Sequence, residues 1–138
     1  MQRTLLLTVA LCSAACAWTP RRTPSSRGPF CYAVQSDGRS GRAAMLPTGI
    51  AFHPAGDSGH AVWLAGPQPR VTDGARAVLR GWGTADIRVT LSTPHFGARL
   101  ELRPSGRTLV GRGFAHGDVG PWTEDWVRVT ATPRRCPR

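Results

Sequence analysis

The chain has 138 residues and a formal net charge of +10 at pH 7, and 41% of its residues are hydrophobic. This length supports one domain rather than two, and this hydrophobic content excludes a generally disordered chain. The 16 glycines and 12 prolines favour many turns and short strands over long helices.

All 18 basic residues are arginine, and the sequence contains neither lysine nor asparagine, a bias typical of GC-rich coding. Nucleic-acid-binding proteins usually gather basic residues on one face with aromatic side chains among them. Here the arginines are spread along the sequence, for example Arg39, Arg42, Arg70, Arg80, Arg88, Arg99, Arg112 and Arg128. We therefore expect no nucleic-acid partner, and we expect the diffuse positive charge to favour an anionic envelope surface.

Residues 1–16 have the features of a secretory signal peptide. Arg3 supplies a positive charge, residues 4–11 form a short apolar run, and small residues follow it. The apolar run is too short to span a bilayer as a stable helix, and no later segment is longer or more apolar. The sequence thus predicts an exported protein without a transmembrane helix.

Two cleavage sites compete at the end of this signal. The tetrapeptide Ser13-Ala14-Ala15-Cys16 resembles the lipobox of bacterial lipoproteins, a family in which the cysteine becomes the lipidated first residue. Ordinary signal cleavage after Ala17 is the alternative. Residues 17–29 are rich in proline, serine and arginine, as expected of an extended tether. We favour lipidation at Cys16 and a location in the cell envelope, with a periplasmic or secreted protein as the alternative.

Either cleavage leaves two cysteines for the folded domain, Cys31 and Cys136. They stand at its two ends, and in an oxidising compartment such a pair predicts one structural disulfide. A metal site is not expected, because no C-x-x-C spacing accompanies them.

The second half of the chain carries the clearest periodicity. Apolar and polar residues alternate with a period of two over residues 87–92, 96–103 and 127–132, which predicts half-buried antiparallel strands. Residues 108–115 are the predicted return strand of a hairpin. Residues 104–107 form a predicted turn. Gly111 and Gly113 lie inside one of these strands and indicate a sharp bend or bulge, as at a barrel corner.

The first half is less regular, with plausible strands over residues 30–35, 49–53, 61–65 and 75–82. Residues 75–80 are also compatible with one short helix capped by Asp73. We predict an all-β domain over residues 30–138, an antiparallel barrel of about eight short strands, with a β-sandwich as the alternative. We favour the barrel because a terminal disulfide brings the first and last strands together and removes the sheet edges.

Residues 86–136 resemble a pattern found in small uncharacterised exported proteins of GC-rich bacteria. The pattern consists of an alternating strand, a second strand, a Ser-Gly turn, a Leu-x-Gly return strand, an acidic loop and a last strand ending in cysteine. The corresponding residues here are Ile87–Leu91, Phe96–Gly97, Leu100–Leu102, Ser105–Gly106, Leu109–Gly111, Asp118 and Val127–Cys136. The leucine-glycine hairpin is also similar to hairpins of lipocalin-like barrels. The resemblance implies a fold and no reaction.

No motif predicts an active site. The sequence Gly56-Asp57-Ser58-Gly59 resembles the segment around the nucleophile of trypsin-like proteases, but turn chemistry explains it without catalysis. The histidines show no metal-ligand spacing, and Glu124 and Asp125 are neighbours in a predicted loop rather than a facing pair of acids. We therefore expect neither a metal nor a cofactor.

Four tryptophans are candidates for ligand binding: Trp63, Trp82, Trp122 and Trp126. Aromatic walls are common in the cavities and mouths of barrels, although filling a core is their more frequent role. We expect a monomeric, non-enzymatic envelope protein whose barrel binds an apolar ligand or a partner surface. The alternatives are an envelope accessory with a purely structural role and a small hydrolase with a site assembled across strands.

Overall fold

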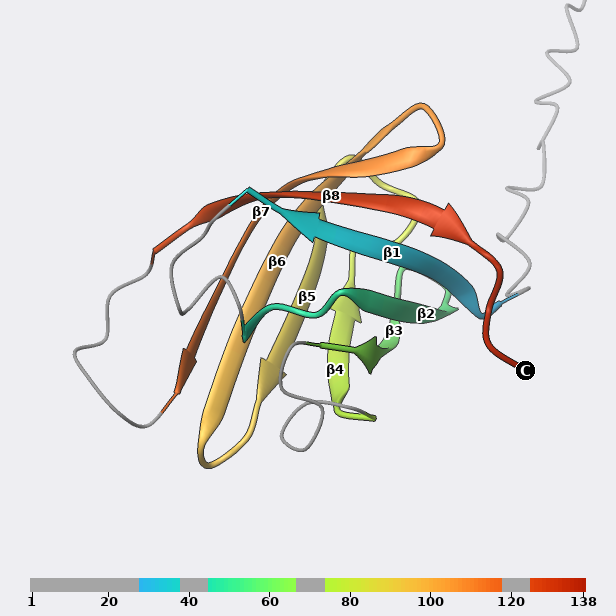
Figure 1. Cartoon of the computed structure of the whole chain (residues 1–138). Coiled ribbons are helices and arrows are strands. Elements are labelled where there is room, and N and C mark those ends of the chain that lie inside the picture. The colour runs from blue at the N-terminus through green and yellow to red at the C-terminus, as the bar shows by residue number, and fades with distance from the viewer. Residues whose placement is uncertain (1–27, 38–44, 67–73, 118–124) are drawn as a thin grey trace, which may run out of the picture.

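The computed structural model describes residues 28–37, 45–66, 74–117 and 125–138. They form eight β-strands in chain order: β1 (Phe30–Ser36), β2 (Gly49–Ala55), β3 (Ser58–Ala65), β4 (Arg76–Arg80), β5 (Ile87–Ser92), β6 (Phe96–Ser105), β7 (Thr108–Gly117) and β8 (Val127–Arg134). Each strand pairs antiparallel with the next, and β8 pairs with β1 to close a barrel (Figure 1). The predicted all-β barrel is confirmed, and the sandwich is not formed.

The least regular part of the first half also forms a strand. Residues 76–80 are β4 rather than a helix, because Ala77 and Leu79 alternate with outward arginine and valine side chains. Trp82 lies beyond the end of this strand, in the connection to β5. In the parts of the chain that the structure describes, no helix is long and apolar enough to cross a membrane.

Because neighbouring strands are antiparallel, the connections divide between the two ends of the barrel. The β2–β3, β4–β5 and β6–β7 connections lie at one end, together with the entry into β1 and the C-terminal residues 135–138. We call this the disulfide end. The other connections lie at the opposite end.

The barrel interior is filled by the inward side chains of all eight strands. Trp63, Phe52, Ile50, Leu79 and Leu100 are almost completely buried in it. β7 contributes little volume, since Gly111 and Gly113 occupy two of its inward positions opposite Leu102 and Leu100. A Cβ atom on Gly113 would lie 2.6 Å from Cδ2 of Leu100, so the missing side chain makes room for a larger neighbour.

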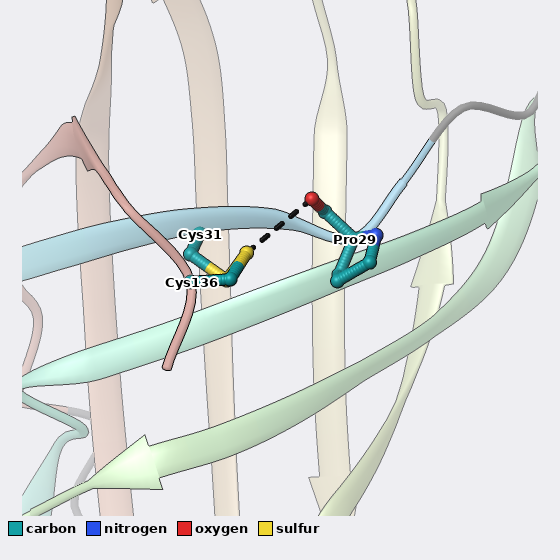
Figure 2. Close-up of a disulfide and its surroundings, with 3 residues drawn as sticks. All are labelled: Pro29, Cys31 and Cys136. Atoms are coloured by element: carbon teal, nitrogen blue, oxygen red, sulfur yellow. Dashed lines mark hydrogen bonds between the residues drawn. A yellow bond between two sulfur atoms is a disulfide. The ribbon is translucent and has the colours of Figure 1, made fainter. Parts of the chain in front are cut away.

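The disulfide predicted between Cys31 and Cys136 is present (Figure 2), and it joins two Cα atoms 5.1 Å apart. Sγ of Cys136 lies 3.4 Å from the carbonyl oxygen of Pro29. A disulfide sulfur carries no hydrogen, so this is a close contact and not a donated hydrogen bond. The bond fixes the C-terminal segment against β1, where the chain enters the barrel.

Candidate functional site

The tryptophans proposed for ligand binding do not gather in one cavity. Trp63 is 1% exposed inside the barrel, and its ring meets Phe96 edge to face with centroids 5.6 Å apart. The indole Nε1–H has no hydrogen-bond partner among the residues that the structure describes. Trp63 therefore fills the core, and Trp82 and Trp126 lie in two other places. Trp122 is outside the described residues, as are residues 1–27 with Cys16.

Trp82 belongs to an aromatic cluster at the disulfide end. Its ring lies 5.1 Å from that of Phe52 and 5.2 Å from that of Phe30, and Tyr32 meets Phe52 edge to face at 5.4 Å. The backbone N–H of Trp82 donates to the carbonyl of Asp57 over 2.9 Å, which fixes the β4–β5 connection over the cluster. Burial raises the pKa of Tyr32.

The cluster extends from the interior to the surface. Phe52 is completely buried, whereas Phe30 is 37% exposed. A hollow of about 280 Å³ adjoins it beside the disulfide, lined by Pro29, Phe30, Cys31, Tyr32, Pro133, Arg134 and Cys136. Aromatic side chains and an arginine thus share one small surface at this end.

Trp126 lies on the outer face of the barrel, at the start of β8. The guanidinium carbon of Arg112 is 4.2 Å from the centre of its ring, a cation–π contact. Phe114 meets the same ring edge to face at 4.6 Å. Glu101 accepts two hydrogen bonds from Arg112, from Nε at 3.0 Å and from Nη2 at 2.8 Å. This side of the barrel therefore presents a mixed aromatic and charged face.

Arginines that are far apart in the sequence meet on this outer face. The register places Arg80 opposite Arg88, Arg88 opposite Glu101, Glu101 opposite Arg112, and Arg112 opposite Arg128. We call these five residues the arginine row. Adjacent strands are about 4.8 Å apart, so the row spans roughly 19 Å across β4 to β8. The spread of these arginines along the sequence did not predict this row, because sequence spacing does not reveal register.

The arginine row is only partly neutralised. Arg88 pairs with Asp86 at 3.0 Å and Arg112 with Glu101, while Arg128 lies 3.9 Å from Asp37. Like charges directly opposite each other, as in Arg80–Arg88 and Arg112–Arg128, are unfavourable in a sheet. A hollow of about 520 Å³ lies along the row, and its lining includes Arg103, Arg112 and Arg128 together with the carboxylates of Asp86 and Glu101.

Two histidines form a cross-strand pair on β2 and β3. The rings of His53 and His60 stack with centroids 4.6 Å apart, and Nη2 of Arg76 lies 3.1 Å from Nδ1 of His60. An arginine can only donate, so Nδ1 of His60 is the acceptor. Desolvation lowers the pKa of His60, and the charges of Arg76 and His53 lower it further. No group of three or more metal-ligating side chains occurs within the described residues.

The protease-like tetrapeptide forms the hairpin between β2 and β3. Gly56 and Asp57 are the turn, and Ser58 pairs with Ala55 as the first residue of β3. Asp118 and Glu124, two of the acids weighed in the sequence, lie outside the described residues. Comparisons with known protein families, with characterised proteins and with solved structures find no match.

Proposed function

We propose that this chain is a non-enzymatic, exported protein of the cell envelope, anchored by lipid at Cys16, which binds an anionic partner at the outer surface of its barrel. The observation that carries the proposal is the arginine row, together with an interior that is already filled. The Cys31–Cys136 disulfide is compatible with export, because such bonds persist in oxidising compartments.

The filled interior favours a partner surface over an enclosed apolar ligand. An apolar ligand inside the barrel would have to displace side chains such as Trp63 and Leu100, which are at most 1% exposed. Removing a well-packed aromatic side chain from a core costs about 3–5 kcal/mol. Binding at the outer face requires no such rearrangement.

The outer face favours an anionic partner. A negative group beside the arginine row would add to the pairing that Glu101 gives Arg112 and Asp37 gives Arg128, and arginine offers a planar fork of donors to carboxylates and phosphates. Phe114 and Trp126 border the row and add apolar area to the same face. The face thus combines charge with a rigid aromatic edge.

The anchor is tested by mass spectrometry of the protein expressed with its own signal and purified from the envelope. We expect a chain that begins at Cys16, carries acyl groups and lacks one pair of hydrogens because of the disulfide. A chain that begins at Trp18 without acyl groups would contradict the lipid anchor.

Binding is tested by retention of the barrel on washed envelope fragments at increasing salt. Substituting Arg88→Gln together with Arg128→Gln should weaken retention several-fold at low salt, because screened charge attraction is lost. The matched control is Arg76→Gln with Arg107→Gln, which removes the same charge outside the row. Equal retention of both variants would favour a purely structural accessory.

A further inference from the structure

We propose that the disulfide end of the barrel docks onto an anionic lipid bilayer. The docking surface consists of Phe30, Trp82, Arg134, Arg135 and Arg138. The inference rests on the proposed lipid anchor at Cys16, which brings this end of the barrel to the membrane. Beyond that anchor, the inference assigns the barrel a second, non-covalent contact with the bilayer. It also assigns the barrel an orientation, with the disulfide end toward the membrane.

The apolar part of the docking surface consists of the adjacent rings of Phe30 and Trp82, which we call the aromatic step. Among the described residues, Phe30 and Val78 are the large hydrophobic side chains that stand out as exposed. The ring of Phe30 packs against Trp82, and Trp82 packs against the buried Phe52. Because Phe52 fills the space behind it, the indole stays at the mouth of the barrel. Aromatic side chains in such positions favour the interface between water and lipid.

The charged part is the C-terminal segment, which the disulfide holds beside the aromatic step. Arg134, Arg135 and Arg138 are all exposed, and they flank Cys136 in the sequence. Arg134, Phe30 and Cys136 line the same hollow. Exposed arginines and an exposed aromatic ring at the same end of the barrel match a surface that has anionic headgroups above an apolar layer. Among the described residues, the acids at this end are Asp57 and Asp86, and Asp86 is paired with Arg88.

The chain's entry into β1 places this end nearest the anchor. Residues 17–27 separate Cys16 from Gly28, and at 3.3–3.6 Å per residue they reach at most about 40 Å. The ten-residue strand β6 adds a further ~30 Å between the two ends of the barrel. A lipid on Cys16 therefore keeps the point where the chain enters β1, at the disulfide end, within about 40 Å of the bilayer.

The experiment uses residues 28–138 without a lipid, so that the anchor cannot mask the contact. This segment contains all eight strands, the β1–β8 closure and the disulfide. Its binding is measured by flotation with vesicles of phosphatidylglycerol and phosphatidylcholine in equal parts, and with vesicles of phosphatidylcholine alone. We expect binding to the mixed vesicles that high salt removes, and at least about tenfold weaker binding to the neutral ones.

Two variant pairs separate this surface from diffuse charge. Substituting Arg134, Arg135 and Arg138 with Gln should weaken binding at least about tenfold, whereas the same change at Arg76, Arg99 and Arg107, outside both the docking surface and the arginine row, should leave it within about twofold. Phe30→Ser should weaken binding, and Val78→Ser, at the other exposed hydrophobic, should not. Melting curves of all variants confirm that they fold. The triple variant at Arg134, Arg135 and Arg138 changes only exposed side chains and none inside the barrel.

Three results would overturn the inference. The first is no binding of the unmodified barrel to the mixed vesicles. The second is an equal loss in the two triple variants. The third is a pair of findings: the barrel binds a short DNA duplex as tightly as it binds the mixed vesicles, and Phe30→Ser does not weaken binding to the vesicles. Together they would indicate charge attraction alone. A chain acylated at Cys16 with any of these results would leave the proposed anchor intact and remove only the docking surface.

Discussion

At the scale of the residue, the two inward glycines of β7 allow this strand to lie close against its neighbour β6. A Cβ atom on Gly111 would lie 1.9 Å from the carbonyl oxygen of Glu101, a backbone atom that cannot move alone. At Gly113 the nearest atom is the end of the Leu100 side chain, which has some freedom to shift. The sequence predicted a bend or bulge here. The structure adds that both positions face inward against β6.

Gly111→Ala should therefore destabilise the barrel more than Gly113→Ala. We expect the latter to cost about 1–3 kcal/mol, the usual range for overpacking a core, and the former to cost more because two backbones must separate. The free energy of unfolding in urea measures both. Gly49→Ala is the matched control, since its Cβ would meet only ordinary contacts of 3.5 Å or longer. Equal costs at Gly49 and Gly111 would contradict this account.

At the scale of the element, the positions of the strands could be predicted from the alternation of apolar and polar residues. Which residues face each other on neighbouring strands could not be predicted in this way. All eight predicted windows contain a strand, because a half-buried strand must alternate and its turns need glycine, proline or aspartate. The arginine row depends on register, which turn lengths and bulges set, such as the register shift between Gly49 and Ile50. The separation of Trp63, Trp82 and Trp126 likewise became visible only once the barrel closed.

Because Arg76 on β4 contacts His60 on β3, the stability of the barrel should depend on pH through the protonation of His60. Folding disfavours its protonated form, so the unfolded chain takes up a proton first as the pH falls. The stability from neutral His60 is thus complete well above its ordinary pKa of 6.5 and is lost as the pH falls through that value toward the lower folded pKa. Arg76→Gln should raise the pKa of His60, as followed by NMR titration.

Arg80→Gln is the control for this measurement, because it removes an equal charge from the same outward face of β4. A similar rise in the pKa of His60 in both variants would show that the long-range field matters and the 3.1 Å contact with Arg76 does not.

At the scale of the whole molecule, one covalent bond joins the first strand to the segment after the last. The cysteines are 105 residues apart, and constraining a loop of that size in the unfolded chain contributes about 4–5 kcal/mol in the chain-entropy treatment. Stability of the entire barrel therefore depends on this bond, and the cysteine spacing predicted it directly from the sequence.

Cys31→Ser should sharply lower the melting temperature under oxidising conditions. For a domain of about 100 residues, a loss of this size corresponds to roughly 15–30 °C. Unmodified protein melted with a reducing agent should behave like the variant, and the reducing agent should not affect the variant itself. An unchanged melting temperature in Cys31→Ser would remove the claim.

The pairing of β1 with β8 also sets an order of events during synthesis. β1 is the first strand to be made and needs the last one as its second neighbour, so an open sheet edge persists until the final residues are available. Long-range pairing of this kind slows folding relative to local contacts. A ribosome that stops before β8 leaves a chain with seven of these strands, an unpaired thiol at Cys31 and an exposed edge on β1. Synthesis of β8 therefore decides whether the barrel can close.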